Sequence, residues 1–158
     1  MKHPAVFIMV ITLALSGLSF AQGKPDFSGT WTLDMAKSDM GQGRPSAQAA
    51  TRTVTVVIKQ TSAVLAIERK AGERVETATL KLDGSESINK SPSGHDIKST
   101  SRWVGSTLVT KSTMPTGEVT AEMSDVRSLS ADGKVMTLDV TRKTPRGDVK
   151  QKLIYNRQ

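Results

Sequence analysis

The sequence predicts an all-β protein that folds as one antiparallel up-and-down barrel of about eight to ten strands. Glycines recur at 72, 84, 94, 105, 117, 133 and 147, at intervals of 10 to 16 residues, and several lie in turn-forming sequences such as Asp83-Gly84 and Asp132-Gly133. Between the turns apolar and polar residues alternate, as in 53–59, which is typical of half-buried strands.

About nine or ten strands are expected in order along the chain, near 28–34, 51–61, 63–70, 73–82, 85–90, 95–104, 106–114, 117–130, 134–144 and 147–157. In 117–130 the alternation fails after Met123, because Val126 and Leu129 fall out of phase, and we expect a β-bulge near Ser124-Asp125. The segment 35–50 predicts a long loop with one short helical turn. Because no segment predicts a helix able to cover an open sheet, closure into a barrel is the way to avoid exposed edges.

The amino terminus predicts a secretory signal peptide, residues 1–21, followed by one barrel domain, 22–158. Lys2 and His3 precede an 11-residue apolar run, 5–15, and Ser19 and Ala21 supply small residues for cleavage after Ala21. The run is shorter than the roughly 20 residues that a spanning helix needs. We therefore expect a periplasmic or secreted bacterial protein with no membrane span after cleavage.

The composition excludes several kinds of chemistry. The chain has no Cys, so it forms no disulfide, thiolate zinc site or lipid-modified cysteine. His95 is the one histidine left after cleavage, too few for a usual zinc site, and we interpret it as an exposed turn residue. The acidic residues are scattered, and no nucleophile elbow, phosphate loop or dinucleotide motif occurs. We expect no metal, no cofactor and no enzymatic activity.

The net charge of +7 raises the question of nucleic acid as a partner. Single-strand binders combine a basic groove with several aromatic platforms, and the predicted domain has only Phe27, Trp31, Trp103 and Tyr155. We expect no nucleic-acid partner. An outer-membrane barrel is also disfavoured, because the alternate faces carry charged or hydroxyl residues and no aromatic girdle.

The first predicted strand carries a family resemblance. Gly29-x-Trp31, within the run FSGTWTLDMAKSDMG at 27–41, resembles the opening of lipocalins and calycins, especially that of short exported bacterial lipocalin-like proteins. The ending, with 132–134, Leu138 and 151–155, is similar as well.

The resemblance implies a structural role for three residues at the base of the barrel, Gly29, Trp31 and an arginine. In the family the tryptophan closes the bottom of the barrel and an arginine from a late strand packs across its ring. Arg157 is the first candidate for this arginine, with Arg142 and Arg102 as alternatives. The resemblance also implies that the 35–50 loop is a lid over the open mouth.

We therefore expect an exported β-barrel that binds a small apolar or amphipathic molecule in its interior. The alternative is an envelope or stress-related module that binds another protein through its exterior. The sequence predicts no oligomeric state. The candidate ligand-lining residues are inward in phase and large or adaptable, and they are Ile58, Leu80, Trp103, Met123, Met136, Leu138 and Tyr155.

Overall fold

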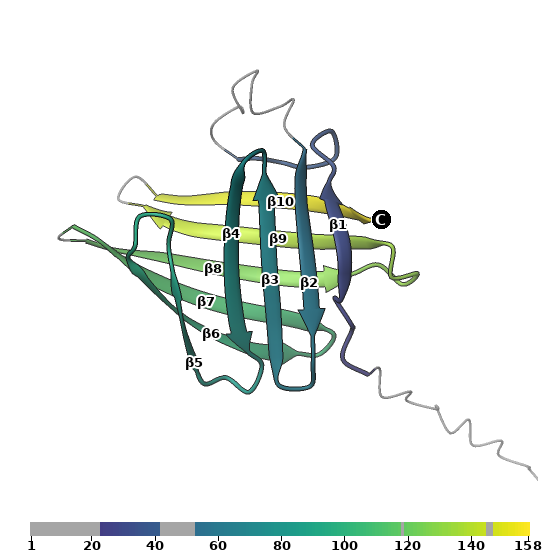
Figure 1. Cartoon of the computed structure of the whole chain (residues 1–158), viewed down its shortest axis with the longest axis horizontal. Helices are drawn as coiled ribbons and strands as arrows, with labels where there is room; N and C mark the ends of the chain where they lie inside the picture. Colours follow the sequence, from purple (N-terminus) through teal and green to yellow (C-terminus); the bar gives the residue numbers. More distant parts are fainter. Residues whose placement is uncertain (1–22, 42–52, 118, 145–146) are drawn as a thin grey trace, which may run out of the picture.

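The computed structural model describes residues 23–41, 53–117, 119–144 and 147–158, and it shows ten antiparallel strands wound into a nearly closed barrel (Figure 1). The strands are β1 (Gly29–Leu33), β2 (Val54–Gln60), β3 (Val64–Ala71), β4 (Arg74–Lys81), β5 (Glu86–Lys90), β6 (Asp96–Val104), β7 (Thr107–Thr116), β8 (Val119–Leu129), β9 (Val135–Thr144) and β10 (Gly147–Arg157). The predicted all-β barrel is confirmed. The expected signal peptide, 1–21, and residues 42–50 of the expected lid lie outside the described residues.

The strands follow the spatial order β4-β3-β2-β1-β10-β9-β8-β7-β6-β5. The first strand pairs with the last, with Trp31 opposite Arg157, so the two ends of the chain close most of the cylinder. The remaining seam lies between β4 and β5, which share no backbone ladder. This seam is the one edge that the closure leaves within the described strands.

Side chains bridge the seam in place of a ladder. The backbone N–H of Thr79 donates to Oδ1 of Asn89 (2.7 Å), and Nδ2 of Asn89 donates to the carbonyl oxygen of Thr79 (3.0 Å). The N–H of Lys81 donates to Oγ of Ser87 (2.8 Å). The side-chain amide of Asn89 thereby takes the place of a backbone partner across the seam. It satisfies both the backbone N–H and the carbonyl oxygen of Thr79.

The β-bulge expected near Ser124-Asp125 is absent, and this prediction was wrong. The registers of β8 with β7 and with β9 run without interruption through Ser124 and Asp125. The side chains keep alternating, but the inward positions after Met123 are Asp125 and Arg127 rather than apolar residues. Charged side chains inside the barrel, and not an extra residue, broke the hydrophobic pattern.

Residues 35–41, the part of the 35–50 segment that the structure describes, are hydrogen-bonded to the last strand, β10. Residues 35–37 form a turn, and Asp39 makes an isolated bridge with Lys152. The hydroxyl of Ser38 accepts from the N–H of Ile154 (2.9 Å). This stretch therefore leaves the barrel along the outer edge of β10.

Trp31 and Arg157 occupy the closed end. Trp31 is fully buried, and Cζ of Arg157 lies 4.3 Å from the centre of its ring. The guanidinium donates to the carbonyl oxygens of Gly133 (2.8 Å) and Ser28 (2.6 Å). Gly29 has φ of 135°, and a Cβ there would lie 2.8 Å from Nη1 of Arg157, so both backbone and space favour glycine. Arg142 and Arg102, the alternative partners, lie at the mouth and on the outer face.

The segment before β1 forms the floor of the barrel. Gln60 fastens it, because Oε1 accepts from the N–H of Phe27 (3.0 Å) and Nε2 donates to the carbonyl oxygen of Pro25 (2.9 Å). Phe27 is thereby held fully buried beneath the interior. The closed end is thus covered by a short extended segment that Gln60 holds by hydrogen bonds, and not by a helix.

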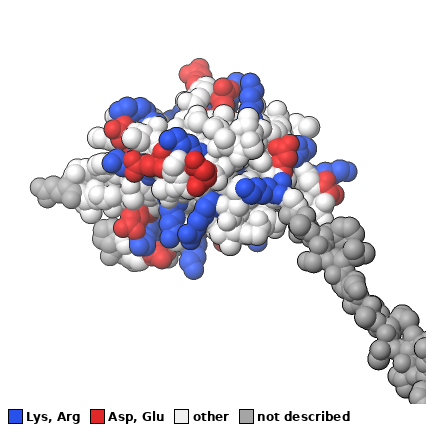
Figure 2. Space-filling model, turned by 90° about the horizontal axis from the view of Figure 1, so that it is seen from below, with Lys and Arg blue, Asp and Glu red and all other residues white. Residues whose placement is uncertain are grey.

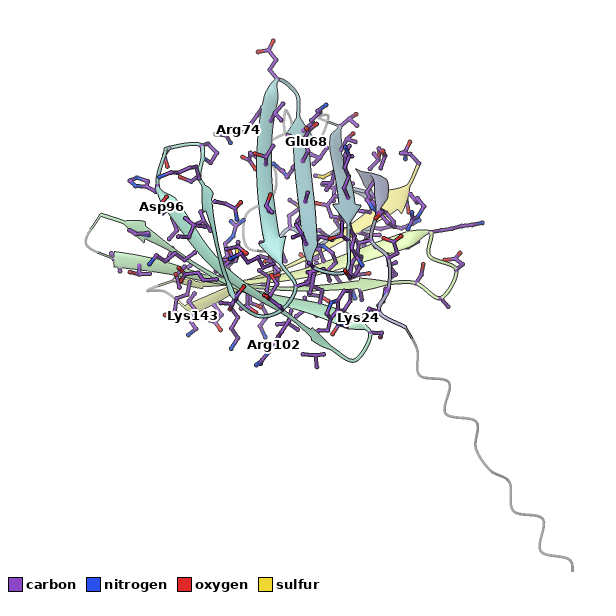
Figure 3. The ribbon with its side chains drawn as sticks, turned by 60° about the horizontal axis from the view of Figure 1, so that its bottom comes forward. Lys24, Glu68, Arg74, Asp96, Arg102 and Lys143 are labelled. Carbon is purple, nitrogen blue, oxygen red and sulfur yellow. The ribbon has the colours of Figure 1, made fainter. Side chains whose placement is uncertain are left out.

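Charges of both signs are interspersed on the outer face that Figure 2 shows. The side chains labelled in Figure 3 come from widely separated places, with Lys24 before β1 and Arg102 and Lys143 on β6 and β9. No helix among the described residues is long and apolar enough to cross a membrane.

We expect Arg157→Lys to lower the free energy of unfolding by about 1–3 kcal/mol, because lysine keeps the charge but loses the planar stacking and the forked donation to two carbonyls. Urea denaturation measures the difference. The matched control is Lys152→Arg, an exposed position on the same strand. An Arg157→Lys variant as stable as the wild type would contradict this role.

We expect Asn89→Ala to lower the free energy of unfolding by about 1–2 kcal/mol, because Thr79 loses partners for its N–H and its carbonyl oxygen. Ile88→Ala, an exposed position on the same strand, is the control and should change stability little. Equal effects of the two substitutions on the free energy of unfolding, measured by chemical denaturation, would show that the Asn89–Thr79 hydrogen bonds do not stabilise the seam.

Candidate functional site

The interior of the barrel has two different walls. The buried side chains of β1 to β4 are apolar, among them Trp31, Val56, Ile58, Leu65 and Leu80. The inward positions of β5 to β8 mix polar and apolar residues, but the buried ones are polar apart from Leu108, and they are Ser87, Ser99, Ser101, Thr110, Ser112 and Arg127. A polar wall facing an apolar wall is an unusual barrel filling, and it marks the candidate site.

Asp125 and Arg127 are the charged residues of the polar wall. They occupy successive inward positions of β8, where Arg127 lies opposite Leu108 and Leu138 in the ladders. Arg127 is only 6% exposed. Nε and Nη1 of Arg127 and Oδ1 of Asp125 are buried and have no hydrogen-bond partner in the described part of the chain. Buried donors and acceptors without partners are rare, so these atoms mark the candidate site.

The electrostatics of this pair follow from its burial. Burial raises the pKa of the Asp125 carboxyl, while the nearby cations of Arg127 and Arg142 oppose the rise. Burial lowers the pKa of Arg127, against the attraction of Asp125. Burial also raises the pKa of the Tyr155 hydroxyl, and Arg69 and Arg127 oppose that rise. Each charge is thus held in surroundings that disfavour it.

Arg127 lies directly above the floor. Its Cζ is 5.9 Å from the ring centre of Phe27, and Phe27 also stacks on Trp103, at 5.9 Å between ring centres. Nζ of Lys24 lies 5.8 Å from the centre of the Trp103 ring. The electron-rich faces of the rings therefore supply part of the compensation that the guanidinium lacks in hydrogen bonds.

A second charged pair lies across the interior on β3 and β4. Nη1 of Arg69 is 3.3 Å from Oε2 of Glu76, opposite it in the ladder, and Nε of Arg74 is 3.7 Å from the other oxygen of the same carboxylate. Both side chains of the Arg69–Glu76 pair are about one third exposed. Unlike Arg127, Arg69 already has a carboxylate within reach.

Two adjoining cavities open next to these residues. The deeper one has a volume of about 200 Å³ and is bordered by Asp125, Arg127 and Thr110 on one side and Ile67 and Leu80 on the other. The second has about 370 Å³ and lies toward the mouth. Its wall is mainly apolar, with Arg142 at its edge, and includes Ile97, Met114, Ala121 and Met123. The two cavities share Ile97, Ser112 and Met123, so they adjoin, and together they are here called the passage.

The seven residues that the sequence predicted as ligand-lining lie in different places. Met123 borders both cavities and Leu80 borders the deeper one. Ile58, Met136 and Tyr155 are buried in the apolar core, with Leu138 packed against it. Trp103 stacks under the floor, beside an outer crevice that also touches Lys24.

The sequence analysis missed Asp125 and Arg127. Their signal was present in the pattern, because two charged residues stand at the inward phase of a strand whose other inward residues are apolar. Hydroxyl residues at the inward phase of 95–114 carried the same signal. No group of three or more potential metal ligands occurs in the described ranges.

Comparison with known proteins supports the fold. No family model matches the chain, and no curated protein matches it. Among solved structures, a REP1-NXSQ fatty acid transporter superposes with a TM-score of 0.60 at 19% identity, covering 83% of this chain and 95% of that one. A zebrafish ileal bile acid-binding protein complexed with cholic acid gives 0.62 at 15% identity, covering 84% and 98%. At such identities the likeness shows the fold alone, that of an antiparallel up-and-down β-barrel.

We expect Asp125→Asn to become more stable relative to the wild type as the pH rises from about 4. With its pKa raised in the folded state, Asp125 keeps its proton at pH values at which the unfolded chain has lost it. Wild-type stability then falls with pH, by at most about 1.4 kcal/mol per unit, until the folded pKa is passed, and asparagine removes this loss. Denaturation at a series of pH values, with the exposed Asp139→Asn as control, measures it. A stability difference independent of pH would contradict the assignment.

Proposed function

We propose that this protein is an exported, non-enzymatic barrel of the lipocalin-like group that binds a small amphipathic acid in its interior, in the periplasm or outside the cell. The single observation that carries the proposal is Arg127, a buried cation with two unpartnered N–H donors beside a cavity. An anionic oxygen is the natural partner of such a group, because charge-assisted bonds of arginine to oxyanions are the strong ones.

The shape of the passage supports an amphipathic ligand. Its deep end holds Arg127 and Asp125, whereas its outer part offers the apolar side chains of Met114, Met123, Ala121 and Ile97 together with the charged residues of the mouth, Glu122, Arg142 and Lys143. Methionine side chains adapt to irregular apolar surfaces. An acidic group seated on Arg127 would therefore place an apolar body along the methionines toward the mouth.

The two structural neighbours are described as a fatty acid transporter and as a bile acid-binding protein. Fatty acids and bile acids are both amphipathic acids, which agrees with the chemistry of Arg127. Because the likeness shows the fold alone, the argument for an acid depends on the side chains of this chain.

The alternative, binding of another protein through the exterior, would need a contiguous apolar patch. The exposed large hydrophobic residues are Val75, Ile88, Val104 and Val119, on β4, β5, β6 and β8. Val104 ends β6 at the closed end, and Val119 begins β8 at the mouth. Such scattered residues favour the interior as the binding surface.

We expect Arg127→Met to weaken the binding of a fluorescent fatty acid, cis-parinarate, at least about tenfold, because the acid loses its charge-assisted hydrogen bonds. Fluorescence titration gives the Kd. Methionine fills similar space without a charge, so the fold should be kept or stabilised. Arg102→Met, an exposed position on the outer face of β6, is the matched control. No binding to the wild type, or equal Kd values in both variants, would overturn the proposal.

Native mass spectrometry of the protein purified from its own host then identifies the bound molecule. A co-purified acid of low mass supports the proposal. A stoichiometric protein partner, with no small molecule, would support the exterior alternative instead.

A further inference from the structure

Four hydroxyl side chains line the inner surface where β6 pairs with β7. Ser99 lies opposite Ser112, and Ser101 lies opposite Thr110. The two oxygens of each pair are 2.9 Å apart, and all four residues are between 1% and 8% exposed. The polar wall therefore carries a row of hydroxyls along one ladder rather than a single polar group.

Each of these pairs has hydrogen-bonding capacity left over. A pair of hydroxyls uses one hydrogen between its two oxygens, so the second hydrogen and several lone pairs remain. Ser99, Ser112 and Thr110 border the deeper cavity, where this capacity faces the space that a ligand would fill. Ser87 differs, because its oxygen already accepts from the N–H of Lys81.

A purely apolar body would be a poor occupant of this space. It would separate the hydroxyls and Asp125 from water without providing hydrogen-bond partners. Leaving buried polar groups unpaired is unfavourable in free energy. Across the cavity, Ile67, Ala78 and Leu80 present an apolar surface. The cavity thus offers hydrogen bonds on one side, and on the other side apolar contact beside the Arg69–Glu76 pair.

We propose that the ligand is an amphipathic acid that carries hydroxyl groups along one side of its apolar body, and that the β6–β7 hydroxyls hold these groups. The inference rests on the proposed function, in which Arg127 receives the acidic end. It adds a specificity for hydroxylated over plain acyl chains, set by Ser99, Ser112 and Thr110.

Two acids of equal length test the specificity, stearate and a dihydroxystearate with neighbouring mid-chain hydroxyls. Isothermal titration gives the Kd of each acid for the wild type and for the double variant Ser99→Ala/Ser112→Ala. We expect the double variant to weaken dihydroxystearate about three- to tenfold, the loss of one or two hydrogen bonds, and to bind stearate as well as before or better. If the hydroxyls of the wall bind only water and do not contact the ligand, the double variant should change the Kd of both acids equally. That result would overturn the inference.

Two further variants keep the test decisive. Thr110→Val removes a wall hydroxyl at nearly constant volume and should discriminate in the same sense if the double variant does not fold. Thr100→Val alters an exposed position on the outer face of β6 that borders neither cavity, and it should leave both Kd values unchanged. If the wild type binds stearate through Arg127 but rejects dihydroxystearate, this inference fails and the proposed function stands. If it binds neither acid, both fail.

Discussion

The buried charges of Asp125 and Arg127 are the constraint on which the rest of the interior depends. A guanidinium that is 6% exposed has lost most of its hydration, and the described chain does not return all of its hydrogen bonds. What the chain does supply is the ring face of Phe27, a nearby carboxylate and a wall of hydroxyls. These features make sense together as surroundings for a charge that is completed by a ligand.

The closed end provides the rigidity that such a charge requires. Phe27 stays under Arg127 because Gln60 fastens the segment before β1, and Arg157 joins that segment to the turn containing Gly133. Without cysteines, the chain achieves this with hydrogen bonds, ring stacking and backbone ladders alone. A site that must hold an unpaired charge is thus built on the best-anchored part of the barrel.

The fold was predictable because its signals are local. Glycine turns and the two-residue alternation placed all ten strands within about three residues of their observed bounds. The site was not predictable by the same rule. Choosing inward residues by hydrophobicity selected Ile58 and Met136, which lie in the core. The same rule interpreted the polar residues near Asp125 and Arg127 as a β-bulge, which the structure does not contain. A hydrophobic pattern identifies what a barrel packs, whereas a ligand site is found where that pattern is violated.

Charge also bears on how a ligand would be selected. Inward arginines stand at both ends of the passage, Arg142 at the mouth and Arg127 at the floor, and the Asp125 carboxylate interacts with both, whereas Glu122 at the mouth is paired with Lys143. The other inward arginine, Arg69, is already paired with Glu76. The passage therefore holds an excess of positive charge, larger still whenever Asp125 is protonated. A neutral apolar molecule could fill the same volume but would leave Arg127 unpaired, so charge separates ligands that shape alone would accept.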